Sequence, residues 1–150
     1  MIRNPRLSDF DQINALGRWF QENSLYRHSG WSDAKSLHWV VTGADPESST
    51  FMLVVEDGDE IVGFFLGNIV EYFFSENLIA QDLVMVFKPE HREGIGEIIK
   101  EILEKFSAWA KTNNATELCV GVTSGIAGEG YEKLLKAVGF NRVGSIYKRT

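Results

Sequence analysis

Residues 86–97 read VFKPEHREGIGE and join the end of an apolar run to the strongest helical pattern in the sequence. Pro89 stops the preceding strand, because proline has no N–H to donate to a sheet ladder. Gly94 and Gly96 open the following helix, whose first N–H groups have no partner inside it and lie at the positive end of its dipole. A phosphate or pyrophosphate can bind there, with Arg92 adding a charge-assisted contact. On the glycines alone, a tight turn without a ligand is an equally good interpretation, because short glycine motifs also occur without ligands.

The pattern on both sides of this turn predicts a mixture of strands and helices. Residues 94–111 predict an amphipathic helix, because apolar side chains recur there every three or four positions. Apolar runs at 51–55 and 61–72 flank the turn residues 57–59 and predict an antiparallel hairpin. Further strands are expected at 2–3, 79–87, 118–122, 140–143 and 145–147, and further helices at 9–22, after Ser32, and at 129–138 with a glycine cap at Gly139. This order predicts a mixed α/β domain with a central sheet rather than a regular parallel alternation.

Length, composition and charge narrow the class of protein. A chain of 150 residues with 44% hydrophobic and 24% charged residues is expected to form one globular domain and excludes a disordered or low-complexity chain. The net charge of −6 argues against a nucleic-acid partner and suits a cationic substrate such as an amine.

The same features bear on location and metal binding. The longest apolar stretch, residues 61–70, is far below the roughly 20 residues that cross a bilayer, and no signal peptide precedes it, so a cytoplasmic protein without a membrane partner is expected. Cys119 is the single cysteine, and the histidines are scattered, so neither a disulfide nor a metal site is expected.

Three segments together resemble a known family. Residues 89–96, PEHREGIG, look like the acetyl-CoA-binding segment of the GNAT superfamily of N-acetyltransferases, and residues 131–144 resemble its fourth helix and Gly-Phe turn. Ile2-Arg3 at the start of the chain also fits, and the element order matches over the whole length. The resemblance implies one acetyltransferase domain over residues 1–150, with a central mixed sheet of about six to seven strands flanked by about four helices. It also implies direct transfer of an acetyl group from acetyl-CoA to a primary amine, in a ternary complex and without a metal.

The resemblance implies where acetyl-CoA binds. In the family, the strand before the glycine turn pairs with the pantetheine arm, and the turn binds the pyrophosphate through backbone N–H groups. His91 stands where the family's turn usually begins with arginine or glutamine, and the two glutamates of the turn lie where it often has basic residues. The implied cofactor contacts are Met85, Val86, Phe87, Arg92, Glu93, Gly94, Ile95, Gly96, Glu97 and Ser124.

Two residues are expected to carry the catalysis. By resemblance, Asp82 on the strand before the turn is the general base, although a strand-end carboxylate facing water is an alternative interpretation. Many members have a tyrosine acid four residues before the Gly-Phe glycine, and here that position is Leu135. Tyr131 lies one helical turn earlier on the same face and is the expected substitute, unless the enzyme works without this acid.

The acceptor site is expected near the loop between the first two helices, which borders the acceptor in the family. Tyr26, His28 and Trp31 lie in that loop. Glu71 lies late on the strand expected at 61–72, next to the strand of Asp82, and is also a second possible general base. The aromatic residues could hold an amine through cation–π contacts, or could simply pack over the core. Small amines, amino acids, antibiotics, protein N-termini and lysines all stay open as acceptors, and so do the monomeric and homodimeric states.

Two functions from other classes also stay open. A degenerate GNAT-fold protein would bind CoA or nothing and act as an interaction module, which Leu135 and the acidic turn favour. An unrelated nucleotide-binding domain would use the glycine turn for ATP or NAD. The hairpin before the turn argues against it, because the dinucleotide-binding fingerprint follows the first strand of a parallel βαβ unit.

Overall fold

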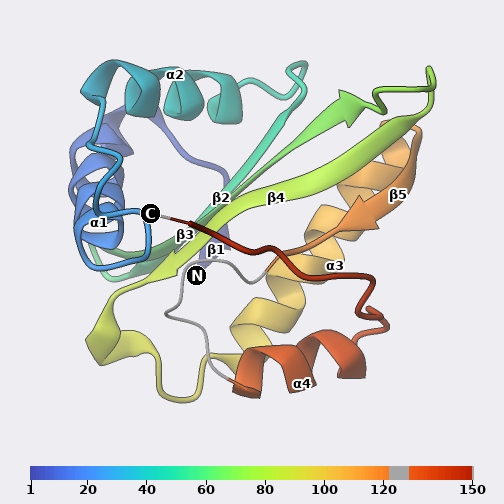
Figure 1. Ribbon diagram of the computed structural model, residues 1–150. Helices are drawn as coiled ribbons and strands as arrows, with labels where there is room; N and C mark the ends of the chain where they lie inside the picture. Colours follow the sequence, from blue (N-terminus) through green and yellow to red (C-terminus); the bar gives the residue numbers. More distant parts are fainter. Residues whose placement is uncertain (122–128, 150) are drawn as a thin grey trace.

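The computed structural model describes residues 1–121 and 129–149. In that part of the chain, five strands form one sheet in the order β1-β2-β3-β4-β5 (Figure 1). All neighbouring strands are antiparallel except β4 and β5, which are parallel. The strands are β1 (Ile2–Arg3), β2 (Thr50–Asp57), β3 (Glu60–Glu71), β4 (Leu78–Phe87) and β5 (Ala115–Cys119), and the helices are α1 (Phe10–Glu22), α2 (Asp33–Ala44), α3 (Gly96–Thr112) and α4 (Glu129–Ala137), with short 3-10 turns η1 (Leu7–Asp9) and η2 (Pro89–His91).

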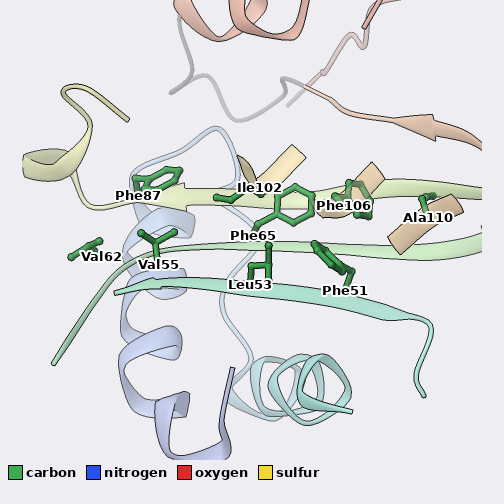
Figure 2. Packing of buried hydrophobic residues seen from close by; sticks show 10 residues of the cluster. Phe51, Leu53, Val55, Val62, Phe65, Phe87, Ile102, Phe106 and Ala110 are labelled. Atoms are coloured by element: carbon green, nitrogen blue, oxygen red, sulfur yellow. The ribbon is translucent and has the colours of Figure 1, made fainter. Parts of the chain in front are cut away.

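Helices cover both faces of the sheet, as the amphipathic patterns require. Ile13 of α1 and Val40 of α2 pack on one face, in a cluster with Val54 of β2. On the other face, Ile102 and Phe106 of α3 pack among the aromatic and aliphatic side chains of β2, β3 and β4 (Figure 2). Burial of one such side chain contributes about 1.5–3 kcal/mol, so these two layers supply much of the stabilisation. The predicted mixed α/β architecture is confirmed.

The number of strands is a correction to the prediction. Residues 140–143 and 145–147, expected to close the sheet, form no strand in the described part of the chain, which has five strands rather than six to seven. Val143 is 96% exposed and Tyr147 is 93% exposed, so their side chains bury no apolar face that would stabilise a strand. The segment instead runs from α4 across the molecule toward α1 (Figure 1).

Backbone conformation moves two other predicted boundaries. The long helix begins at Gly96 rather than at Gly94, because Gly94 has a φ of 73°, which no helical residue adopts. After α3, Asn114 takes a φ of 62° and turns the chain directly into β5, which therefore begins at residue 115 instead of 118. The predicted glycine cap of α4 is confirmed, because Gly139 has a φ of 96° and the Phe140 N–H donates to the Leu135 carbonyl at 2.9 Å.

A bulge in β4 lies next to the point where its pairing with β5 ends. Leu66 of β3 stands opposite Val84, whereas Gly67 stands opposite Asp82, so Leu83 is an extra residue on β4. Such a bulge bends a strand and strengthens its twist. Pairing between β4 and β5 ends at Gln81, and in the described part of the chain no strand pairs with the second half of β4 on that side.

None of the helices described in residues 1–121 and 129–149 combines the length and the apolar character that a bilayer crossing requires.

Candidate functional site

A cavity of 640 Å³ lies beside the second half of β4. Its walls come from β4, from the turn that leads into α3, from the first residues of α3 itself, from α4, and from one residue of α1. Most of the lining side chains are apolar, as in many sites for small molecules and cofactors. The lining residues are Phe20, Met85, Val86, Phe87, Arg92, Gly94, Ile95, Gly96, Ile99, Gly130, Tyr131, Lys133, Leu134 and Ala137.

The open edge of β4 forms the first wall. The Lys88 N–H donates to the Val62 carbonyl at 2.8 Å, so Lys88 faces β3. Successive residues of a strand face opposite ways, and the backbone groups of Phe87 and Met85 therefore point away from β3, toward the side on which β5 has ended. The Phe87 carbonyl accepts a bond from Arg92 Nε at 3.4 Å. Met85 consequently offers an edge to which an extended ligand can add as a strand would.

The glycine turn and the N-terminus of α3 form the base of the cavity. A Cβ built on Gly94 or Gly96 would meet nothing within 4 Å, so the backbone at both positions is open to a ligand. No side chain caps the N-terminus of α3 at Ile95. Its first N–H groups thus lack a side-chain acceptor, and an anion bound there would satisfy them.

Two cationic side chains line the cavity from opposite walls. The Arg92 guanidinium lies 5.5 Å from the centre of the Trp19 ring, a cation–π contact that, with the Phe87 carbonyl, fixes its position. Lys133 extends from α4. By contrast, Glu93 and Glu97 are exposed and are not among the residues that line the cavity, so they are not placed as the implied cofactor contacts.

Most of the implied cofactor contacts are therefore brought together in one place. Met85, Val86, Phe87, Arg92, Gly94, Ile95 and Gly96 all line the cavity, whereas Ser124 lies outside the described residues.

Asp82 lies at the bulge, where β4 leaves β5. It pairs with Gly67, and Gly67 approaches Phe106 of α3, so the Asp82 side chain faces the α3 side of the sheet. Its Oδ1 accepts a bond from the Gly121 N–H at 2.9 Å. Burial raises the pKa of Asp82 to about 6, and the bond from Gly121 partly offsets that rise. Asp82 is half-buried, which differs from the alternative interpretation of a carboxylate facing water.

Tyr131 lines the cavity from α4, one helical turn before Leu135. Its hydroxyl is buried and has no hydrogen-bond partner in the described part of the protein. Burial raises the pKa of Tyr131, and the charge of nearby Asp82 raises it further, so the hydroxyl stays protonated at neutral pH. Leu135, at the family's usual tyrosine position, is only 8% exposed and belongs to the core.

The predicted acceptor residues are dispersed. Trp31 donates from Nε1 to Asn14 at 2.8 Å, and its ring packs so closely on Gly17 that a Cβ there would lie 2.4 Å from it. Trp31 therefore packs against α1, in agreement with the alternative interpretation of this loop. His28 is exposed. Glu71 pairs with Leu78 at the start of β4, about 20 Å along the strand from the cavity at about 3.3 Å per residue.

Tyr26 is the predicted acceptor residue that approaches the cavity. Its ring centre lies 6.3 Å from that of Phe20, which lines the cavity. Phe20 and Lys133 were not singled out in the sequence. Lys133 could have been found from its helical spacing, because it lies on the same face of α4 as Gly130, Leu134 and Ala137. No pattern in the sequence predicts that Phe20 lies near β4.

In the described part of the chain, no group of three or more His, Cys, Asp or Glu side chains is arranged to hold a metal ion.

Comparison with known proteins identifies the fold. No family model and no curated protein matches the sequence. Solved structures match over 100% of this chain, among them a ribosomal-protein-alanine N-acetyltransferase from Brucella melitensis biovar Abortus 2308, with a TM-score of 0.70, 16% identity and 97% of that chain covered. An aminoglycoside acetyltransferase from an uncultured soil metagenomic sample, in complex with sisomicin, matches with a TM-score of 0.65, 16% identity and 95% of that chain covered. A transcriptional regulator from Bacillus halodurans C-125 matches with a TM-score of 0.74, 14% identity and 98% of that chain covered. The fold implied by the resemblance to GNAT acetyltransferases is thereby confirmed.

Proposed function

We propose that this protein is a GNAT acyltransferase that uses acetyl-CoA to acetylate a primary amine by direct transfer. The observation that carries the proposal is the cavity between the free edge of β4 and α4, with the uncapped N-terminus of α3 at its base. An extended chain that ends in phosphates matches these features, because it needs a strand edge along its length and N–H donors at one end.

The residues present fit coenzyme A. The Met85 backbone is oriented to bond the amides of the pantetheine arm, and the apolar walls suit its alkyl portions. The first N–H groups of α3, together with Arg92 and Lys133, would hold the phosphates. The open space beside Gly94 and Gly96 leaves room for phosphate oxygens close to the backbone. When bound, acetyl-CoA supplies an acetyl group already activated as a thioester.

Asp82 would take the proton that the acceptor ammonium must lose before it attacks. With a pKa of about 6, its carboxylate is mostly ionised at neutral pH and still basic enough to accept a proton, directly or through a water molecule. Its place at the bulge, three residues before Met85, puts it next to the wall where the pantetheine arm would end.

Tyr131 would protonate the departing sulfur. The buried hydroxyl points to this role because it has a proton to donate and no partner for it in the described part of the protein. The raised pKa means that the hydroxyl still carries its proton at neutral pH, so the proton is present when the thiolate leaves. At neutral pH the Asp82 carboxylate is therefore mostly deprotonated, while the Tyr131 hydroxyl near the same cavity is protonated. General acid–base catalysis needs one group of each kind.

A primary amine is the acceptor class that the arrangement supports. The net charge of −6 favours cationic ligands. Two of the structural neighbours are a ribosomal-protein-alanine N-acetyltransferase and an aminoglycoside acetyltransferase, and both names are consistent with an amine acceptor for this chain.

The test is a transfer assay with acetyl-CoA and a panel of amines. Thiol release is followed continuously, and the acetylated amine is identified by mass spectrometry. Transfer by the wild-type protein above the rate without protein, abolished by Asp82→Asn, supports the proposal. Binding of acetyl-CoA without transfer to any amine would instead favour the interaction module, and binding of ATP in preference to CoA would favour the nucleotide-binding alternative.

A further inference from the structure

The loop between α1 and α2 holds a primary ammonium in this structure. Lys148 Nζ donates to the Leu25 carbonyl and lies 5.2 Å from the centre of the Tyr26 ring. A carbonyl oxygen and an aromatic face are two independent kinds of contact that favour an alkylammonium. Lys148 reaches this loop from a position 123 residues away in the sequence.

Two buried polar side chains build this part of the loop. Gln21 is 7% exposed and donates from Nε2 to the Tyr26 carbonyl at 2.9 Å. Ser24 is 3% exposed, and its Oγ accepts a bond from the Tyr26 N–H at 3.1 Å. Both backbone groups of Tyr26 are therefore fixed by side chains withdrawn from water, so the loop conformation does not depend on Lys148.

The ammonium lies next to the proposed acetyl-CoA cavity. The Tyr26 and Phe20 ring centres are 6.3 Å apart, and Phe20 lines the cavity. A ligand whose cation replaced that of Lys148 could extend past Phe20 toward β4.

The segment that carries Lys148 is otherwise little packed against the described part of the protein. Val143 is 96% exposed, Ile146 is 79% exposed and Tyr147 is 93% exposed. Among the hydrogen bonds and ion pairs of the described residues, the bond from Lys148 to Leu25 is the one that ties residues 143–149 to another part of the protein. Displacement of Lys148 would therefore break few other contacts.

We propose that the Leu25 carbonyl and the Tyr26 ring form a recognition subsite for an ammonium of the acceptor, and that Lys148 occupies it in competition with the acceptor. Both contacts favour the charged form, so the group bound here keeps its proton and is not the attacking amine. The acceptor accordingly carries two amines, one recognised and one acetylated, as alkyl diamines do. This inference rests on the proposed function, because it assigns a substrate class to that site.

The experiment titrates 1,5-diaminopentane into the protein saturated with CoA, followed by calorimetry, with pentan-1-ol as the uncharged control. Lys148→Gln should bind the diamine about fivefold more tightly than the wild-type protein, because the competing ammonium is gone. Lys136→Gln, an equal change of charge on the exposed side of α4, should match the wild type. Within the Lys148→Gln protein, Tyr26→Leu should weaken diamine binding about fivefold, and Tyr26→Phe should retain it.

Two binding results would contradict the subsite proposal. Equal diamine affinity of the Lys148→Gln and wild-type proteins, or full affinity after Tyr26→Leu, would overturn the subsite. The same variants are then compared in the transfer assay, where Lys148→Gln should lower KM for the diamine and leave KM for acetyl-CoA unchanged. If amines are acetylated at rates that do not depend on Lys148 or Tyr26, the subsite proposal is wrong and the proposed function still holds. If the diamine binds as predicted but no amine is acetylated, the subsite proposal is supported and the proposed function is wrong.

Discussion

Replacement of Asp82 by asparagine should stabilise the protein at pH 8, and the gain should disappear at low pH. Burial raises the pKa of Asp82 from 3.8 to about 6, so the ionised carboxylate disfavours the folded state. At about 1.4 kcal/mol for each pKa unit the cost is about 3 kcal/mol, and partial exposure of the side chain reduces it to about 2 kcal/mol. The asparagine side chain would keep the bond from the Gly121 N–H, because its amide oxygen accepts as the carboxylate does.

The direction of the pH dependence follows from proton binding. Between about pH 4 and pH 6 the folded protein holds the Asp82 proton more tightly than the unfolded chain does, so this group's contribution to stability falls as the pH rises. Below that window the carboxyl is neutral in both states, and Asp82→Asn should change the free energy of unfolding very little. Above it, the substitution should add about 2 kcal/mol.

Urea unfolding at pH 3 and pH 8, monitored by circular dichroism, measures the difference between the variant and the wild type. Asp59→Asn, in the exposed turn between β2 and β3, is the matched control and should show no such pH-dependent gain. The reasoning is refuted if Asp82→Asn has the same effect at both pH values, or if it destabilises the protein at pH 8. In the transfer assay the same variant should lower kcat/KM by at least about 100-fold, because the base is lost.

Three further changes probe the acid, the phosphate contact and the packing of the acceptor loop. Tyr131→Phe should lower kcat about 100-fold without weakening acetyl-CoA binding. It should also raise the free energy of unfolding by about 1 kcal/mol, because it removes a buried hydroxyl without a partner in the described part of the protein. Unchanged kcat would show that Tyr131 is not the acid. Lys133→Gln should weaken the binding of CoA several-fold and leave that of pantetheine unchanged in calorimetry, whereas Lys136→Gln, outside the cavity, should affect neither; equal losses for the two ligands would contradict a phosphate contact. Gly17→Ala should lower stability by about 1–3 kcal/mol in urea unfolding, because its Cβ would lie 2.4 Å from the Trp31 ring; wild-type stability would show that this packing adapts freely.

Local patterns in the sequence predict most of the elements. The helical spacing of α3, the hairpin of β2 and β3, and the cap at Gly139 depend on neighbouring residues, and each is present in the structure. The segment after α4 is different. Its apolar residues after the glycine cap predict a closing pair of strands. A strand also needs a partner edge and a face to bury, and Val143 finds neither in the described part of the chain.

The site is predictable where it depends on one turn and less so where it depends on distant segments. Gly94 and Gly96 identify the base of the cavity because strand, turn and helix are contiguous. The raised pKa of Asp82 depends on the bulge at Leu83 and on burial, which no local pattern encodes. Likewise, the approach of Phe20 to the cavity depends on how α1 packs against the sheet.

The most direct test of the account is calorimetric titration of acetyl-CoA into the wild-type protein and Gly96→Val. A valine Cβ at position 96 meets no protein atom within 4 Å, so the fold should tolerate it, while its side chain would enter the space assigned to the phosphates. Gly144→Val, also in open space but outside the cavity, is the matched control. We predict micromolar binding by the wild type and Gly144→Val, and a loss of at least about tenfold in Gly96→Val. Absence of acetyl-CoA binding by the folded wild-type protein, or full affinity in Gly96→Val, would contradict the assignment of this cavity to acetyl-CoA.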